Sequence, residues 1–275
     1  MTSYFDSHLH LDFAAFDQDR AEVLKRASDL GVSKMVVLGC SREQWTRLSS
    51  LQEQNFEVLS TTAAPDIRVG VGLHPYWSND ASFEKQSGIE TLLFDLQEKV
   101  VQLRAVCVGE MGVDKNKGAP LQKQIELFEA QLVLARDLSL PVVMHQVGHR
   151  QEFLAVIRRV GLSKAGGVVH GFSGDATWAK TLVKEGLFLG VGAGIVHPAR
   201  VRLRQAVAHI PLEHLLIETD APDARFAVGP DAPTGVRSEP GDVVLVAQTL
   251  AQIHGVDVPL VAQITWDTAS RLFQF

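Results

Sequence analysis

The chain has 275 residues, 46% of them hydrophobic and 21% charged, an ordinary balance for a globular protein with a sizeable core. Its formal net charge of −6 argues against binding duplex nucleic acid through a broad basic surface. No run of about 18 apolar residues indicates a transmembrane helix, and Met1–Asp6 lacks the basic-then-apolar pattern of a signal peptide. We therefore expect a cytoplasmic protein.

Short β-branched runs alternate along the chain with segments whose apolar residues recur at helical spacing. The predicted strands are Tyr4–His10, Lys34–Cys40, Ile67–His74, Val106–Val113, Pro141–Gln146, Gly167–Phe172, Leu187–Val191 and Leu215–Thr219. The predicted helices are Gln18–Leu30, Arg42–Gln54, Gly88–Lys99, Pro120–Ala135, Arg150–Val160, Ala176–Glu185, Ala199–His209, Gly241–His254 and Leu260–Leu272. The least regular stretches are 55–66, 76–87 and 223–240, and the last of these is predicted to cover a site.

Eight strands alternating with helices predict an α/β fold, a parallel (β/α)8 TIM barrel, as a single domain over residues 1–275. The apolar strands agree, because barrel strands are covered on both sides. A doubly wound open sheet is the alternative, but it more often has a Gly-rich turn after the first strand, where this chain has His-x-His. Cys40 and Cys107 lie inside apolar runs, which predicts small core residues and no disulfide.

The first strand ends in Asp6-Ser7-His8-Leu9-His10. Successive side chains of a strand point to opposite faces, so His8 and His10 are expected to project the same way, with Asp6 two residues upstream. Two imidazoles on one face form half of a transition-metal site.

Further residues of the metal-ligating types end the later strands. They are His74, Glu110, His145, His170 and Asp220. A barrel gathers the C-terminal ends of its strands around one mouth, so these side chains should converge with the His-x-His pair. Burying so many polar groups without partners would cost several kcal/mol, a penalty that bound metal removes.

The predicted metal ligands are His8, His10, Glu110, His145, His170 and Asp220. They are too many for one open zinc site but suit two divalent ions roughly 3.5–4 Å apart, bridged by Glu110. One ion would be held by His8, His10, Glu110 and Asp220, and the other by Glu110, His145 and His170. Mixed imidazole and carboxylate ligands suit Zn, Mn or Fe, or Mg if water completes the coordination. With Asp220 as the proton acceptor, the expected reaction is hydrolysis by metal-activated water.

These motifs together resemble the TatD family of metal-dependent deoxyribonucleases and related hydrolases, which belongs to the amidohydrolase-type barrels. The matching segments are Asp6–His10, Gly72–Pro75, Gly109–Asp114, Pro141–His145, His170–Gly174 and Glu218–Pro222, and the His-Gly-Phe-Ser-Gly form is similar to the YjjV-like branch. The resemblance implies a two-metal site on the residues above and cleavage of DNA phosphodiester bonds, often exonucleolytic, with Mg or Mn. It also fits Glu110 as the bridge, where many related barrels have a carboxylated lysine.

The chain departs from the family pattern at three places, which bear on the choice of substrate. His145 is followed by Gln146-Val147-Gly148-His149-Arg150 in place of the common Ser-Arg, which removes an arginine unless Arg150 substitutes. The usual Gly-Leu-Asp-Tyr reads Gly112-Val113-Asp114-Lys115, which loses an aromatic residue, and the frequent Asn-x-Pro reads Ser238-Glu239-Pro240.

The candidate catalytic residues are Asp220, Glu110 and His74, and the candidate substrate contacts are His74, Arg150 and Arg225. Lys115, Arg237 and Trp77 are weaker candidates for contacts to phosphate or base. Glu218 and Asp6 are predicted to orient ligand histidines from behind.

DNA is the leading substrate, and a small ester, lactone or amide is the alternative, favoured by the acidic charge and the missing Ser-Arg pair. Metal binding without turnover is a third hypothesis, in which Asp220 would have no evident purpose. We expect a monomer, because no exposed apolar helix face is evident.

Overall fold

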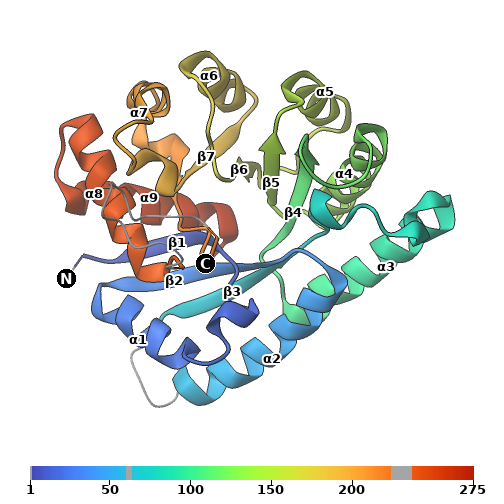
Figure 1. Cartoon of the computed structure of the whole chain (residues 1–275), viewed down its shortest axis with the longest axis horizontal. Helices are drawn as coiled ribbons and strands as arrows, with labels where there is room; N and C mark the ends of the chain where they lie inside the picture. The colour runs from blue at the N-terminus through green and yellow to red at the C-terminus, as the bar shows by residue number, and fades with distance from the viewer. Residues whose placement is uncertain (1, 60–63, 224–236) are drawn as a thin grey trace.

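The structure is a computed structural model that describes residues 2–59, 64–223 and 237–275. Eight parallel strands form one sheet in the order β1 to β8 (Figure 1). They are β1 (Tyr4–Leu9), β2 (Val32–Gly39), β3 (Asp66–Val71), β4 (Cys107–Asp114), β5 (Val142–Val147), β6 (Gly167–Val169), β7 (Leu187–Val191) and β8 (Leu215–Ile217). All eight predicted strands are confirmed, β7 with its predicted bounds.

The helices lie around the outside of the sheet (Figure 1). They are α1 (Arg20–Asp29), α2 (Arg42–Leu59), α3 (Gln86–Leu103), α4 (Leu121–Asp137), α5 (Arg150–Val160), α6 (Ala176–Lys184), α7 (Val201–Ala208), α8 (Val243–His254) and α9 (Val258–Phe273). The prediction that irregular structure begins at residue 55 was wrong, because α2 continues to Leu59. No glycine or proline interrupts that segment, so nothing in its backbone chemistry ends the helix earlier.

The sheet curls into a nearly closed barrel, which rules out the doubly wound alternative, because every strand neighbours the next one in the chain. The chain next to β8 meets β1 through two main-chain hydrogen bonds, Asp220 N to His8 O (2.9 Å) and His10 N to Ala221 O (2.7 Å). The Asp6 carboxylate completes this seam, since it accepts hydrogen bonds from the backbone N–H (2.9 Å) and hydroxyl (2.6 Å) of Thr219. Asp6 therefore joins the two edge strands of the barrel.

Asp6→Ala should lower the free energy of unfolding by about 1–3 kcal/mol, because it leaves the buried N–H and hydroxyl of Thr219 without their acceptor. Urea unfolding of the metal-free protein measures the change. Asp29→Ala is the control, since that exposed carboxylate pairs only with Lys25 and should cost about 0.5 kcal/mol or less. Equal losses in the two variants would show that the seam does not depend on Asp6.

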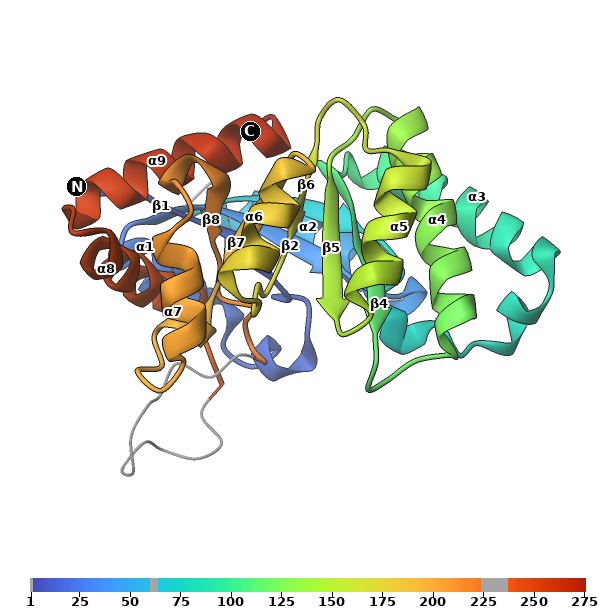
Figure 2. The ribbon, with the colours of Figure 1, turned by 90° about the horizontal axis from the view of Figure 1, so that it is seen from above.

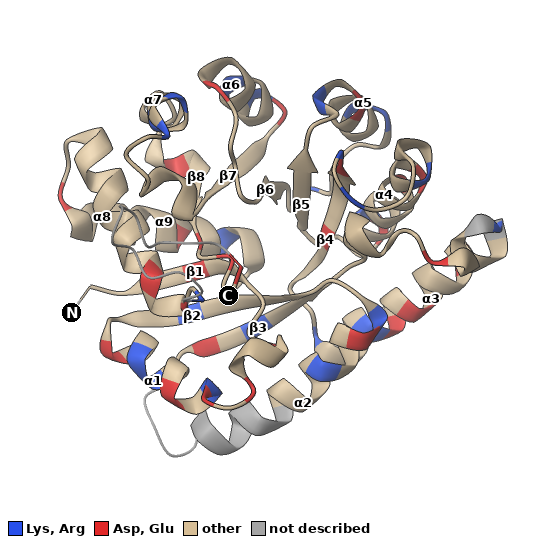
Figure 3. Cartoon of the chain, viewed as in Figure 1, with Lys and Arg blue, Asp and Glu red and all other residues tan. Residues whose placement is uncertain are grey.

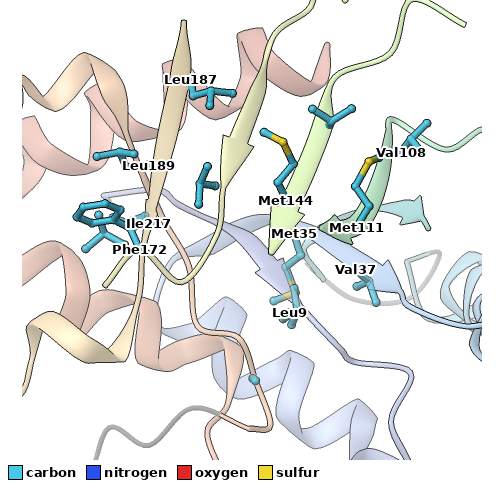
Figure 4. Packing of buried hydrophobic residues seen from close by; sticks show 14 of the residues in the cluster. Leu9, Met35, Val37, Val108, Met111, Met144, Phe172, Leu187, Leu189 and Ile217 are labelled. Carbon is cyan, nitrogen blue, oxygen red and sulfur yellow. The ribbon is translucent and has the colours of Figure 1, made fainter. Parts of the chain in front are cut away.

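Two apolar layers hold the barrel. The larger layer packs the outward side chains of the strands against the helices. Figure 4 draws 14 of its residues, among them Leu9, Met144 and Ile217. The smaller layer gathers residues of six strands with the end of α9, which is possible only inside the barrel: Phe5, Val36, Leu38, Cys107, Val143, Val168, Leu216, Ala269, Leu272 and Phe273. Helix α9 lies across the end where the strands begin (Figure 2), so the opposite mouth is left for polar groups.

Within the described residues, no single helix is long and apolar enough to cross a membrane. The segments Pro240–His254 and Val258–Phe273 reach that length and hydropathy only as a pair bent by 112°.

Irregularities in two strands change which side chains face the interior. Between Asp6 and Leu9, β1 has one residue more than the matching stretch of β2, and between Val108 and Met111, β4 has one more than β5. Leu9, Val108 and Met111 all belong to the outward layer. The extra residue is therefore what lets Glu110 point inward, since strict alternation would give it the outward face of Val108.

Candidate metal centre

The structure brings all six predicted metal ligands, with His74, to one cluster at the carboxyl ends of the strands. Glu110 lies at its centre, 2% exposed, and only Asp220 and His145 of the set are partly accessible, with 30% and 12% of their side chains exposed. Asp220 has a left-handed backbone (φ 56°), a conformation that aspartate adopts more readily than most residues.

One oxygen of Glu110 faces the first strand. Glu110 Oε2 lies 3.3 Å from His8 Nε2 and 3.6 Å from His10 Nε2. Asp220 Oδ1 approaches the same two nitrogens, at 3.5 and 3.4 Å. Two imidazole nitrogens and two carboxylate oxygens thus converge on one point.

The other oxygen of Glu110 faces strands 3, 5 and 6. Glu110 Oε1 lies 2.5 Å from His170 Nε2, 3.0 Å from His145 Nδ1 and 3.2 Å from His74 Nε2. The ring nitrogens of His145 and His170 also face each other at 3.0 Å. The two oxygens of one carboxylate therefore serve two separate groups of histidines.

Hydrogen bonds behind the rings decide which nitrogens carry lone pairs toward Glu110. His10 Nδ1 donates to the carbonyl of Leu38 (2.9 Å), and His145 Nε2 donates to Asp114 Oδ2 (2.9 Å). The nitrogens that face Glu110 are then unprotonated in the neutral rings, as metal ligation requires. In His74, by contrast, the proton faces Glu110, because its Nδ1 accepts the Tyr76 N–H (3.1 Å) and leaves a proton on Nε2.

The cluster fits divalent metal ions. Among the described residues, neither ring nitrogen of the buried His8 has a hydrogen-bond partner, and His170 Nδ1 also lacks one. Buried nitrogens without partners are costly, and unprotonated nitrogens facing one another repel. The atoms present could also form three-residue groups around an ion, among them His8, His10 and Asp220, and His74, Glu110 and His145.

The pKa values show a cluster that attracts positive charge. Burial opposes charge on His8, but Glu110 and Asp220 outweigh it and raise the His8 pKa to about 10. Burial is likewise outweighed at His145, where Asp114 and Glu110 raise the pKa to about 9. The histidines in turn hold the pKa of Glu110 well below its ordinary value despite its burial. Divalent cations would satisfy these carboxylates in place of protons.

Asp114 is a functional residue that the sequence reasoning missed. It is buried at the end of β4, where Oδ2 holds the His145 ring and Oδ1 accepts the backbone N–H groups of Asn116 (2.6 Å) and Lys117 (3.1 Å). A carboxylate that fixes the far nitrogen of a ligand histidine sets its tautomer and orientation. Its place in the Gly109–Asp114 motif, four residues after Glu110, was the available signal.

Asp114→Asn should weaken binding of the ion on the His145 side by about 10- to 100-fold, because an amide orients and polarises the ring less well than a carboxylate. Calorimetric titration of the metal-free protein with Zn²⁺ or Mn²⁺ measures the affinity. Asp137→Asn, an exposed carboxylate at the end of α4, is the matched control. Unchanged titration of both variants would remove Asp114 from the site.

Asp6 and Glu218 were both predicted to orient ligand histidines, and only Glu218 lies behind one of them. Asp6, predicted to orient the His8 ring, contacts Thr219 and only the backbone N–H of His8 (3.4 Å), because the extra residue of β1 turns it away. Glu218 fits its predicted place: Oε1 accepts the Gly171 N–H (2.5 Å) and lies 3.8 Å from His170 Nδ1. A side chain at Gly190 would collide with Glu218, so that glycine makes room for the carboxylate.

Cys40 was predicted to be a core residue and is indeed buried, but it borders the cluster. Its thiol lies 3.5 Å from Glu110 Oε2 and 3.8 Å from His10 Nδ1. Burial raises the pKa of Cys40 to about 12, so the thiol carries its proton and donates to Glu110.

The predicted substrate contacts are less well placed. Arg150 begins α5, pairs with Asp175 (2.9 Å) and lies over the ring of Trp178, without contact to the cluster. Arg237 is tied to Asp19 and Glu239. Arg225 lies outside the described residues, as does most of the stretch predicted to cover the site. Trp77 does lie near the cluster, with its ring centroid 5.8 Å from that of His74.

A nearly closed eight-stranded α/β barrel with imidazoles and carboxylates gathered at the carboxyl ends of its strands defines a metal-dependent hydrolase with an amidohydrolase-like fold. The family model described as "TatD related DNase" matches residues 5–274, and the chain belongs to this family.

Some similar proteins are named only as metal-dependent hydrolases, and others are named as exonucleases. It is 31% identical over 272 residues to the "Uncharacterized metal-dependent hydrolase YabD" of Bacillus subtilis, covering 98% of both chains. It is also 31% identical over 271 residues to the "3'-5' ssDNA/RNA exonuclease TatD" of Erwinia tasmaniensis, covering 98% of this chain and 99% of the relative. The crystal structure of YjjV, a TatD homologue from Escherichia coli, aligns with a TM-score of 0.82 and 29% identity over 99% of this chain and 98% of that one.

Proposed function

We propose that the chain hydrolyses phosphodiester bonds of DNA with two divalent metal ions, Mg, Mn or Zn, held in the candidate metal centre. The position of Glu110 carries this proposal, because its two oxygens lie between two separate groups of imidazole nitrogens. His8, His10, Glu110 and Asp220 would hold one ion, and Glu110, His145 and His170 the other. The whole chain, residues 1–275, would act as one hydrolase domain.

When bound, such ions lower the pKa of a coordinated water to about 7 and neutralise charge on the phosphate under attack. Asp220 would accept the proton of the attacking water. It lies at the accessible edge of the cluster, and the nearby His10 and His8 rings hold its pKa well below the ordinary value despite burial, so it is ionised.

His74 would donate a hydrogen bond from Nε2 to an oxygen of the scissile phosphate. Burial lowers its pKa, so it is a neutral ring whose only proton faces the cluster. Arg150 and Arg225 remain proposed contacts to neighbouring phosphates, and Arg150 would first have to leave Asp175.

The relatives named 3'-5' ssDNA/RNA exonucleases support a nucleic acid substrate. In the part of the chain that the structure describes, Lys and Arg are mixed with Asp and Glu along the outer helices (Figure 3), so contacts to nucleic acid would be local ones at the mouth.

A small ester, lactone or amide is the second candidate substrate, and the environment of Gln146 favours it. The Gln146 amide bonds to the carbonyl of Gly148 and accepts the Trp178 indole N–H (3.0 Å), at the position where a phosphate-binding pair is common in the family. This stretch after β5 thus offers no free cation directly beside His145 within the described residues.

The deciding experiment incubates metal-stripped protein with single-stranded and duplex DNA after adding back Mg²⁺, Mn²⁺ or Zn²⁺. Metal-dependent cleavage that is lost in Asp220→Asn supports the proposal. Cleavage that persists at the parent rate in Asp220→Asn identifies a contaminant. If no DNA is cleaved with any metal, the proposal is wrong, and hydrolysis in a panel of small esters, lactones and amides would establish the second candidate.

A further inference from the structure

Two aromatic side chains stand at the mouth beside the candidate metal centre. Tyr76 and Trp77 follow His74 in the short helix η2 (Pro75–Trp77), with 38% and 39% of their surface exposed. The Tyr76 ring centroid lies 4.3 Å from that of His74 and 5.9 Å from that of His145. An accessible aromatic face therefore adjoins the cluster directly.

A pocket of about 460 Å³ opens on the other side of these rings, within the usual range for small-ligand sites of roughly 300–1,000 Å³. Tyr76, Trp77 and Phe83 line it, together with Arg42 at the start of α2 and the carboxylates of Glu43 and Asp80. Tyr76 contacts His74 and also lines the pocket, so it borders both the candidate metal centre and the pocket.

Lys117 lies against the Tyr76 ring, and Tyr76, Trp77 and Lys117 together are called the wall. Lys117 Nζ lies 4.5 Å from the centroid of the Tyr76 ring, and among the described residues this exposed ammonium forms no ion pair. Its loop is anchored at the site, because the carboxylate of Asp114 that holds His145 also accepts the Lys117 N–H. A cation free to meet an anion is thus held next to the cluster, unlike Arg150 and Arg237.

We propose that Tyr76, Trp77 and Lys117 form a nucleotide subsite, in which an unpaired base stacks on the aromatic rings and the adjoining phosphate contacts the ammonium. This inference rests on the proposed hydrolysis of DNA and names the residues that would favour a single strand, the form named for the exonuclease relatives. Bases inside a duplex are already stacked and paired, so they cannot use the rings. The loop after β4 has Lys115 at the position where an aromatic residue is usual in the family. Tyr76 and Trp77, in the loop after β3, would supply the aromatic contact in its place.

The test measures binding of a single-stranded ten-nucleotide oligothymidylate by fluorescence anisotropy. The full chain carries Asp220→Asn so that cleavage is slow, and Mn²⁺ is present. Tyr76→Ala and Trp77→Ala should each raise Kd by about 5- to 150-fold, the range of base stacking on aromatic rings (about 1–3 kcal/mol at 1.4 kcal/mol per tenfold). Tyr76→Phe keeps the ring and should restore binding. Lys117→Met, at an exposed position, should lower the slope of log K against log salt by about one.

Phe94→Ala removes another exposed aromatic, on the outer face of α3, and serves as the matched control. Equal Kd values for Tyr76→Ala, Trp77→Ala, Phe94→Ala and the parent would overturn the subsite, as would duplex DNA binding as tightly as the single strand. A different outcome combines lost binding in the Tyr76, Trp77 and Lys117 variants with no DNA cleavage by the parent protein, whose Asp220 is unchanged. That result would keep the subsite and reject the proposed DNA hydrolysis. The two inferences therefore fail separately.

Discussion

Glu110→Gln should reduce the metal content of the purified protein below the two ions proposed for each chain and lower hydrolysis on the order of 10³-fold or more, about 4 kcal/mol. The carboxylate offers Oε2 to the His8 side and Oε1 to the His145 side. Glutamine keeps one oxygen and replaces the other with an NH₂ group, which repels a cation. At least one ion must then lose its shared ligand.

Metal analysis after gel filtration, together with the rate on a phosphodiester substrate, checks this expectation. Glu218→Gln is the matched control, since it changes a second buried carboxylate that faces His170 from behind. It should cost only about 10- to 100-fold, as supporting groups usually do. Two tightly held ions in Glu110→Gln would falsify the bridge, and a larger loss in Glu218→Gln would reverse the proposed roles.

Asp220→Asn should lower kcat by about 10²–10⁴-fold with a much smaller effect on KM, because an amide cannot accept the proton of the attacking water. Asparagine adopts the left-handed backbone at this position as readily as aspartate, so the loop should keep its shape. The side chain also contributes one oxygen beside His8 and His10, and the metal content should therefore fall by no more than one ion.

Steady-state kinetics with added metal separates kcat from KM in this variant. Asp257→Asn, an exposed carboxylate just before α9, the helix across the opposite end of the barrel, is the control and should behave like the parent. A kcat within error of the parent at saturating metal would show that another group accepts the proton.

The eight strands, and the end of the barrel at which the candidate ligands lie, could be predicted from the sequence because both depend on local patterns. Strand β7 and helix α5 have the bounds that their apolar spacing indicated. The ends of β3, β6 and β8 were predicted too late, yet the residues beyond them still run beside the preceding strand, as the bond from His170 N to Met144 O of β5 shows. The candidate ligands were therefore placed correctly at the carboxyl ends of the strands, although the predicted strand boundaries were shifted.

The orientation of the site residues depends on contacts that local patterns do not contain. An extra residue in β4 is visible only in its register against β5, and it reverses the face on which Glu110 lies. The same holds for β1, where alternation predicted Asp6 beside His8 but the register turns it to Thr219. The tautomer of His145 likewise depends on Asp114, whose carboxylate lies on a different strand.

The sequence by itself determined a parallel barrel, the residue types of a candidate metal site and the end of the barrel where they meet, because strand ends and side-chain alternation are properties of short segments. The tertiary structure alone decided that Glu110 divides its oxygens between two groups of histidines, that Asp6 closes the barrel, and that Tyr76 and Lys117 stand beside the cluster. These outcomes arise from register and packing between distant strands and loops, whose partners no short segment specifies.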